Sequence, residues 1–309
     1  MELFKKKTFI NFMDLRKLTG FVSLVSCIIA ILLILVKGLA LSSEFTGGIQ
    51  VELRFANPVE PDQIKEQLKN EGFNDLKVQN YGSTRDILIR MANEKTFNGK
   101  NIAEQIQSLF THEGQSVVIR RTEYVGSEVG TELAEQGSVA VLLAILATMI
   151  YIALRFEYRF ALSAAIALCH DVIIVLGIFS LFQIEFNLAT LAAILAVLGY
   201  SLNDTIVVFD RVRENLRKIR KKSTIFVINL SINQTLSRTL ITSWLTLLVV
   251  LALLFFGGKS LFGFSLALTL GIITGTYSSI YVAGACALSL GLSRADLLPK
   301  SKIKFDNMP

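Results

Sequence analysis

Long apolar runs separated by short charged connections fill most of this 309-residue chain. Six of the runs approach the ~20 residues that an α-helix needs to cross the hydrocarbon core of a bilayer. They lie at 19–41, 136–154, 161–182, 188–209, 239–257 and 261–290. The pattern therefore predicts an α-helical polytopic membrane protein with six transmembrane helices, the first at 19–41 and the other five within 136–290.

Residues 44–135 follow a different pattern, in which short apolar segments of strand or helix period alternate with turn residues. Strands are predicted at 49–55, 76–82, 86–92 and 115–125, and helices at 61–72 and 101–110. The order β-α-β-β-α-β is that of the ferredoxin-like module. We therefore expect one α+β domain between transmembrane helices 1 and 2, with a turn from Ser83 to Arg85 joining its two central strands.

Basic residues are concentrated on one side of the predicted membrane. If six spans alternate in direction, 18 of the 31 Lys and Arg residues fall in the segments 1–18, 155–160, 210–222 and 291–309. The positive-inside rule makes these segments cytoplasmic. Both the N-terminus and the tail are then expected inside the cell, and the domain at 44–135, with a net charge of −5, outside the cytoplasm.

Composition agrees with a membrane protein, since 52% of the residues are hydrophobic and the mean hydropathy is +0.54. The basic connection 210–222 is expected to fix topology and to attract anionic membrane lipids, and a partner could also dock there. Because basic residues flank spans without interleaved aromatic residues, no nucleic acid is expected as a partner. The three cysteines lie in spans at no metal-ligand spacing, so no metal site is expected.

A carboxylic acid and a guanidinium group interrupt two of the apolar runs. Asp204 lies 17 residues beyond Asn187 in the fourth span, which places it roughly 25 Å from the outer surface. Arg238 lies 19 residues before Gly257 in the fifth span, roughly 28 Å from the same surface. A charge in the hydrocarbon core costs at least ~2.5 kcal/mol, so we expect the two side chains to meet, directly or through water.

Two interpretations of this pair remain open at this stage. A buried ion pair can be a static contact that orients helices. Alternatively, Asp204 and Arg238 form a proton relay, in which separation of the helices favours the protonated acid and closure favours proton release. Tyr200, Ser201, Asn203 and Thr205 surround Asp204 with hydrogen-bonding groups, and Tyr200, Asn203 and Thr205 are the candidate supporting polar residues.

A second ionisable cluster lies near the middle of the third span. His170 and Asp171 are favoured as a polar packing contact between helices, with membership of a proton path as the alternative, since histidine titrates near neutral pH. In the sixth span, Gly271 and Gly275 form a GxxxG pair, which is typical of close helix packing.

Several of these segments together resemble the SecF branch of the SecD/SecF family, within the resistance-nodulation-division superfamily. The motifs are EFTGGIQVELRF at 44–55, VGSEVGTEL at 125–133, LRFEYR at 154–159, HDVIIVLGIFSL at 170–181, LGYSLNDTIVVFDRVREN at 198–215, QTLSRTLITS at 234–243 and FGG at 256–258. Glu44 stands where the family usually has Asp, and Ser127 where it usually has Pro. The resemblance covers most of the chain.

The resemblance implies a protein-export function without enzymatic activity. Members of the family work with SecD on the SecYEG channel and use the proton-motive force to complete translocation of unfolded preprotein after the SecA ATPase step. YajC and YidC are further implied partners, and protons rather than a cofactor supply the energy. The family's relay residues match Asp204 and Arg238, and its opening motif matches Glu44, Phe45, Thr46, Gly47 and Gly48, a candidate hinge.

Three alternative functions are weighed against this one. A proton-coupled exporter of small molecules or lipids would have the same superfamily fold, but the small outer domain has no obvious apolar ligand-binding segment. An intramembrane protease would need a nucleophile or an HExxH spacing beside His170, and the sequence has neither. A passive scaffold for the translocon is the third alternative, and proton-coupled activity distinguishes it from a motor.

Overall fold

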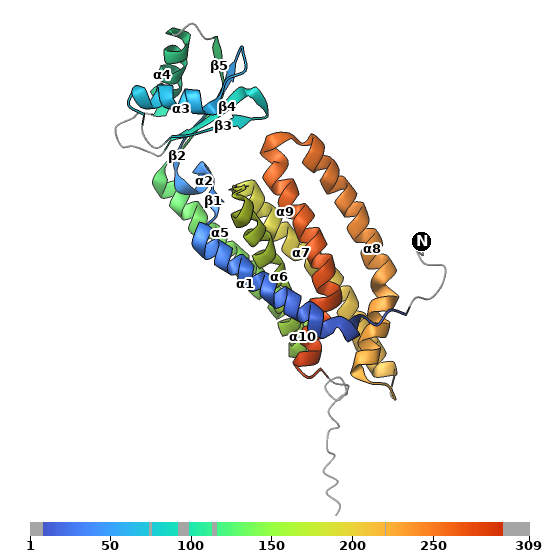
Figure 1. Cartoon of the computed structure of the whole chain (residues 1–309). Helices are drawn as coiled ribbons and strands as arrows, with labels where there is room; N and C mark the ends of the chain where they lie inside the picture. Colours follow the sequence, from blue (N-terminus) through green and yellow to red (C-terminus); the bar gives the residue numbers. More distant parts are fainter. Residues whose placement is uncertain (1–8, 74–75, 92–98, 113–115, 220, 293–309) are drawn as a thin grey trace, which may run out of the picture.

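The computed structural model describes residues 9–73, 76–91, 99–112, 116–219 and 221–292. Within these residues, six helices are long and apolar enough to cross a membrane, which confirms the predicted six-helix organisation. They form a bundle with a small α+β domain at one end (Figure 1). The predicted cytoplasmic segments 1–18 and 291–309 lie partly outside the described residues, at 1–8 and 293–309.

The membrane helices extend beyond most ends of the apolar runs that predicted them, but the first of them ends at Lys37 rather than at 41, because Gly38 breaks the helix and Ala40–Leu41 form a strand. They are α1 (Arg16–Lys37), α5 (Ser127–Arg155), α6 (Tyr158–Phe182), α7 (Leu188–Lys218), α8 (Thr224–Phe256) and α9 (Gly258–Tyr277). A short 3₁₀-helix, η1 (Phe12–Leu15), precedes α1, and α9 continues through the π-helix η2 (Ser278–Val282) into α10 (Ala283–Ser289). Hydropathy marks the length inside hydrocarbon, whereas backbone hydrogen bonding continues into the charged flanks. For this reason α8 begins at Thr224 rather than near 239.

The α+β domain, called the outer domain after its predicted location, has the predicted succession of elements. These are β2 (Gly48–Phe55), α3 (Pro61–Asn70), β3 (Leu76–Tyr81), β4 (Ser83–Met91), α4 (Gly99–His112) and β5 (Val117–Val125). The strands form one antiparallel sheet in the order β3-β4-β2-β5. The predicted turn is misplaced, because β4 already begins at Ser83 and Gly82, with φ of +92°, makes the connection.

The core of this domain lies between the sheet and its two helices. Val51 and Leu53 of β2 and Ile89 of β4 are fully buried, and they pack in one cluster with Ile64 of α3 and Phe110 of α4. Residues at alternate positions of a strand face the same side of a sheet, which explains the alternation of buried and more exposed positions along β2. The alternation of apolar and polar residues in the sequence therefore reflects which residues of the strand face this core.

Short elements join the domain to the bundle at the segment after α1. β1 (Ala40–Leu41) pairs in parallel with β6 (Glu185–Phe186), which lies between α6 and α7. The one-turn helix α2 (Ser43–Thr46) follows, and its Glu44 accepts a hydrogen bond from the backbone N–H of Leu188 at 2.6 Å. A carboxylate is favourable at the amino end of a helix, so Glu44 stabilises the start of α7.

The candidate hinge residues form a close-packed crossing in this structure. Gly47 has a φ of +72°, and a Cβ atom at this position would lie 2.7 Å from the Cα of Ser127. A Cβ on Gly130 would lie 2.8 Å from the backbone N of Gly47. The chain entering the domain therefore touches the chain leaving it, and only glycine fits at both positions. Movement about this crossing stays a prediction.

Two further contacts connect the domain to the same end of the bundle. Arg90 on β4 forms an ion pair with Glu185 in the loop before α7. On the other side, Lys259 at the turn between α8 and α9 donates to the backbone oxygen of Asn80 at 2.6 Å. The hydroxyl groups of Tyr81 and Ser260 lie 3.1 Å apart. In Figure 1 the turn between α8 and α9 reaches up beside the sheet.

The residues before α1 are attached to α8 at the opposite end of the bundle. The backbone N–H of Met13 donates to the side-chain oxygen of Asn229 at 2.9 Å. Asn233 exchanges two hydrogen bonds with the backbone of Ile10, at 2.9 and 2.8 Å. The Met13 side chain is fully buried, so this segment packs into the bundle rather than lying loose on it.

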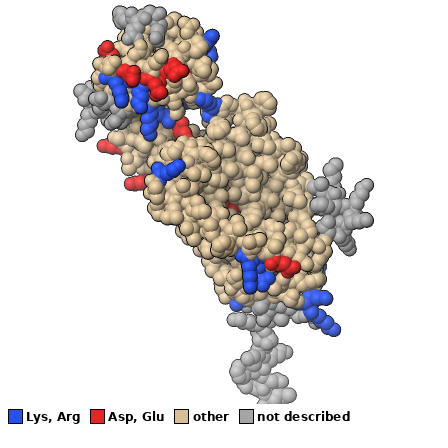
Figure 2. All heavy atoms as spheres, viewed as in Figure 1, with Lys and Arg blue, Asp and Glu red and all other residues tan. Residues whose placement is uncertain are grey.

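Charged side chains are gathered at the two ends of the molecule. On the face seen in Figure 2, Lys, Arg, Asp and Glu cover the outer domain and the far end of the bundle, and a broad band between them is almost free of charge. At the far end, Arg155 faces Asp210 at 4.0 Å, and Glu214 pairs with both Arg211 and Lys218. The uncharged band has the surface that a bilayer requires.

The glycine crossing leads to a first prediction. Gly130→Ala should destabilise the protein by ~1–3 kcal/mol, because the new methyl group would overlap backbone atoms that have no free space to move into. Gly126→Ala is the matched control, since a Cβ at Gly126 meets nothing within 4 Å. Unfolding of both variants titrated with SDS measures the difference. Equal stability of the two variants would show that the crossing is not tightly packed.

Candidate functional site

The polar centre of the bundle depends on a close approach of α7 and α9. A Cβ atom at Gly271 would lie 2.1 Å from a methyl group of Val197, and one at Gly275 would lie 3.0 Å from the Cβ of Ser201. The GxxxG pair of the sixth span thus packs against α7 within the chain. This contact brings Ser201 up to the π-helix η2, which begins just after Gly275.

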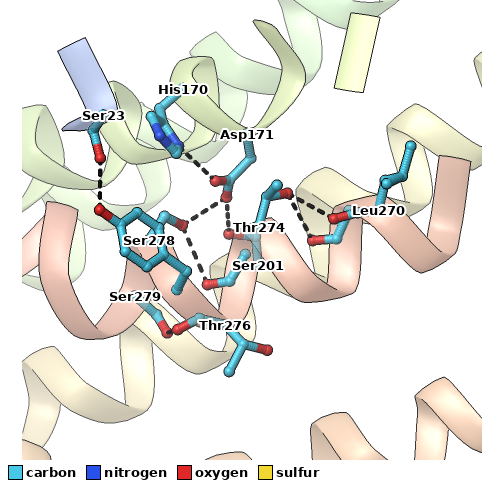
Figure 3. A network of polar contacts seen from close by, with 12 residues as sticks. Ser23, His170, Asp171, Ser201, Leu270, Thr274, Thr276, Ser278 and Ser279 are labelled. Atoms are coloured by element: carbon cyan, nitrogen blue, oxygen red, sulfur yellow. Dashed lines mark hydrogen bonds and ion pairs between the residues drawn. The ribbon is translucent and has the colours of Figure 1, made fainter. Parts of the chain in front are cut away.

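The most completely bonded polar group in this region is the carboxylate of Asp171 on α6 (Figure 3). Its Oδ2 accepts hydrogen bonds from Ser201 of α7 at 2.6 Å and from Ser278 of η2 at 2.7 Å. Its Oδ1 lies 3.0 Å from Nδ1 of His170. The Asp171 side chain is 0% exposed, so three donors replace the water that it gives up.

A second carboxylate, that of Asp204, lies three residues beyond Ser201 on α7. It is 4% exposed, and its Oδ2 accepts one hydrogen bond, at 3.4 Å, from Ser243 of α8. The Ser243 hydroxyl also lies 3.2 Å from the hydroxyl of Tyr200 and 2.8 Å from that of Thr276. A distance of 3.4 Å is near the upper limit for a hydrogen bond, so Asp204 is held more loosely than Asp171.

The segment from Thr276 to Ser278 serves both carboxylates. Ser278 donates to Asp171, whereas Thr276 contacts Ser243, the partner of Asp204. Between them, the Tyr277 hydroxyl lies 3.0 Å from that of Ser23 on α1 and donates to the backbone oxygen of Thr19. π-Helical turns occur frequently at functional sites, because the extra residue redirects neighbouring side chains.

The predicted partner of Asp204 is close to it but makes no direct ion pair. Arg238 lies on α8 between Gln234, which bonds to Arg211 and Asn215 of α7, and Ser243. It is five residues from Ser243, which corresponds to about 7.5 Å along the helix axis. Its charge still acts on the Asp204 carboxylate. Arg238 is exposed on the bundle surface, and among the described residues no ion pair within 4.0 Å joins it to Asp204.

The other predicted supporting residues have different surroundings. Tyr200 belongs to the Asp204 cluster through Ser243, as expected for a supporting residue. Asn203 is exposed and points away from this cluster's buried side of α7. Thr205 is buried, and so is Thr239 next to Arg238, yet neither hydroxyl has a hydrogen-bond partner among the described residues. Buried hydroxyl groups normally bond to protein or water, so these two mark polar positions in the α7 and α8 helices.

Three residues of the site were not predicted from the sequence: Ser243, Thr276 and Ser278. Ser201 was predicted as a polar neighbour of Asp204, and the structure instead bonds it to Asp171. Serine and threonine are ordinary in membrane helices, where they often bond to a carbonyl of their own helix, as Thr242 does with Arg238. Ser243 lies within the motif QTLSRTLITS, which was the available signal. In the described part of the chain, no group of three His, Cys, Asp or Glu residues is arranged to hold a metal ion.

The shared role of Ser243 leads to a second prediction. Ser243→Ala should lower the free energy of unfolding by ~1 kcal/mol, because it removes the hydroxyl that joins α8 to Asp204, Tyr200 and Thr276. Thr242→Val is the control, since that hydroxyl bonds only to carbonyls of its own helix. SDS-titrated unfolding compares the two. A loss as large in Thr242→Val would contradict a bridging role for Ser243.

Comparison with known proteins identifies related sequences and structures. A family model described as protein export membrane protein SecD/SecF, C-terminal, matches residues 105–293. Protein translocase subunit SecF of Pseudomonas aeruginosa is 46% identical over 97% of this chain and 98% of its own length. The protein of the same name from Vibrio alginolyticus is 45% identical over 100% and 99%, respectively.

Two solved structures share the fold. The crystal structure of SecDF, a translocon-associated membrane protein from Thermus thermophilus, matches with a TM-score of 0.85 and 36% identity. A crystal structure of SecDF in a super-membrane-facing form matches with a TM-score of 0.70 and 35% identity. Both matches cover 94% of this chain but 40% of the SecDF chain, so this chain corresponds to less than half of those proteins.

Proposed function

The chain belongs to the SecD/SecF family of protein export membrane proteins, and we propose that it is an accessory subunit of the preprotein translocase. In this proposal it uses the proton-motive force, together with SecD, to promote late translocation of unfolded preprotein. The identity of 46% over nearly the full length of a protein translocase subunit SecF supports the role in translocation. The buried carboxylate of Asp204 at the contact between α7 and α8 supports the coupling to protons.

The proposed setting is the inner membrane, with both termini in the cytoplasm and the α+β domain, a ferredoxin-like module, on the outer side. Six apolar helices and the charge-poor band of the surface support a multi-pass membrane protein. The bonded basic residues Arg155, Arg211 and Lys218 lie at the end of the bundle away from the domain, as the positive-inside rule requires for this orientation.

Asp204 is the proposed proton carrier because its carboxylate is only weakly hydrogen-bonded. One hydrogen bond at 3.4 Å ties it to Ser243, and protonation would neutralise the charge on which Arg238 acts. Loss of that attraction favours a rearrangement between α7 and α8. One proton crossing a 100 mV potential supplies ~2.3 kcal/mol, which is enough to shift a two-state equilibrium by about 50-fold. No cofactor takes part in this proposal.

Helix α8 offers a route from this site to the outer domain. Ser243 lies in its middle, and α8 ends one residue before α9, whose first turn carries Lys259 and Ser260, which bond to Asn80 and Tyr81 of the domain. A shift of α8 against α7 would therefore displace one attachment of the domain, while Arg90 and Glu185 hold the other. The two SecDF matches, nearly equal in identity and coverage but different in TM-score, support a change of shape in this family.

The partners proposed from the family are SecD, the SecYEG channel, SecA acting before this subunit, and possible contacts with YajC, YidC and membrane lipids. The match to 40% of a SecDF chain supports SecD as the partner that supplies the remaining part. Unfolded preprotein is the proposed substrate of the outer domain. A scaffold without proton coupling is the second candidate, and it is an outcome of the experiment below.

The experiment measures gradient-driven export in inverted membrane vesicles, with a preprotein arrested in the channel and ATP removed. Asp204→Asn should slow this step by up to about 50-fold, the factor that ~2.3 kcal/mol represents, because the side chain no longer exchanges a proton. Arg238→Met should slow it as well, since the charge that draws Asp204 back is lost. Export driven by SecA and ATP should stay at the wild-type rate in both variants.

Two charge-matched variants on α7 provide the controls. Asp210→Asn changes an exposed carboxylate further along α7, and Arg217→Met removes an exposed charge near the end of that helix. Both should keep the wild-type response to the proton gradient. An unchanged response in Asp204→Asn, with normal assembly into the membrane complex, would reject the motor and leave the scaffold as the function.

A further inference from the structure

We infer that Asp171 is a positioning residue for the Asp204 site, acting through the junction of α9 and η2, where Thr276 and Ser278 lie. The inference refines the proposed function and rests on it only for the export measurement. Asp171 is connected to Asp204 by a sequence of contacts rather than directly. Each contact joins a different pair of elements, as Figure 3 shows for the part around Asp171.

The first step is the anchoring of η2 by the carboxylate. Asp171 accepts from Ser278 at 2.7 Å and from Ser201 at 2.6 Å, so a single oxygen ties α6 to both η2 and α7. Ser201 and Ser278 are also almost fully buried, at 1% and 0% exposed. Buried charged hydrogen bonds of this length are among the stronger ones in proteins, and their loss leaves unpaired groups.

The second step is the position of the Thr276 side chain, which follows from the anchoring of Ser278. Thr276 lies two residues before Ser278, and its hydroxyl is 2.8 Å from that of Ser243 on α8. Thr276 lies in the last turn of α9 and Ser278 begins η2, and the two side chains reach different neighbours, α8 and α6. With Ser278 fixed, the Thr276 hydroxyl is fixed beside Ser243.

The third step is the effect on Asp204 itself. Thr276 donates its own proton to the backbone oxygen of Ile272 at 2.7 Å, so its hydroxyl accepts from Ser243. The single Ser243 proton is therefore shared between Thr276 at 2.8 Å and the Asp204 carboxylate at 3.4 Å, while Tyr200 donates to Ser243. A displaced Thr276 would leave the Ser243 proton free to bond to Asp204 alone. Asp171 thereby sets the surroundings of Asp204 without touching it, and its own three donors keep it in place while the helices around Asp204 rearrange.

The charged and titratable groups around Asp171 agree with an anchoring role. His170 contacts it from α6, and the His170 ring lies 6.1 Å from that of Tyr277 at the end of α9. From α1, Cys27 is near enough to interact with the Asp171 charge. From α7, the nearest carboxylate along the helix is Asp204, one turn beyond Ser201. No Lys or Arg of the described residues pairs with Asp171 within 4.0 Å, so hydroxyl groups and His170 stabilise it.

The test compares Ser278→Ala with Ser279→Ala in the full chain within its membrane complex. The Ser279 hydroxyl bonds only to the backbone oxygen of Thr276, so the two changes remove the same atom from neighbouring, fully buried positions. Ser278→Ala should slow gradient-driven export about fivefold, and Ser279→Ala should leave it unchanged. Asp171→Asn, which keeps the shape of the side chain, should slow export to a similar extent and guards against a folding defect in Ser278→Ala.

A spectroscopic readout separates positioning from general damage to the bundle. The infrared band of the protonated Asp204 carboxyl group, identified by its absence in Asp204→Asn, should shift in Ser278→Ala and in Asp171→Asn but not in Ser279→Ala. This band reports the surroundings of Asp204 even if Asp204→Asn exports normally, so failure of the proposed function and failure of the inference are distinguishable. An unshifted band in Ser278→Ala and Asp171→Asn would overturn the inference.

A double-mutant comparison completes the design. If Ser278 acts through Thr276 and Ser243, Ser278→Ala combined with Ser243→Ala should export no more slowly than Ser243→Ala alone. Residues that act independently would instead give multiplied effects. Multiplied losses would show that Ser278 and Ser243 belong to separate functions, and would reject the route from Asp171 to Asp204.

Discussion

The absence of water in a bilayer is the constraint on which the membrane part of this protein depends. Each polar group there must find its partner inside the chain. Asp171 meets this requirement with three donors drawn from its neighbour His170, from α7 and from η2. Those hydroxyl groups come within reach because Gly271 and Gly275 let α9 approach α7 at distances that a side chain would prevent. The close packing of these small residues is therefore what allows the buried Asp171 carboxylate to find its hydrogen-bond partners.

Two buried carboxylates on neighbouring helices have opposite characters. Asp171 is fully enclosed and held by short bonds, whereas Asp204 has a single long bond to Ser243 and a guanidinium group nearby that does not touch it. A group that must gain and lose a proton needs contacts that break at little cost, and a group that keeps helices in register needs the reverse. The division between a tightly bonded acid and a loosely bonded one fits the proposed function, in which protonation of Asp204 changes the contact between α7 and α8.

The sequence predicts the architecture well and the site in part. Strands such as β2 and helices such as α3 were identified because alternation and helical period survive in a small domain with one core. Asp171 and Asp204 were found because charged residues stand out in apolar runs. The partners of these acids were missed, since a serine such as Ser278 looks like any other small residue of a membrane helix. The expected contact between Asp204 and Arg238 is indirect, because matching depths along two helices do not determine which way the side chains point.

The bond between Glu44 and the start of α7 bears on how the protein is made. Its two partners are 144 residues apart, and the whole outer domain and two membrane helices lie between them. During synthesis, Glu44 therefore leaves the ribosome long before Leu188 does. The bond from Glu44 to the start of α7 and the pairing of β1 with β6 require α5, α6 and the domain to be in place. The junction is therefore among the last contacts to form, and until then the start of α7 has only the cap supplied by its own Asn187.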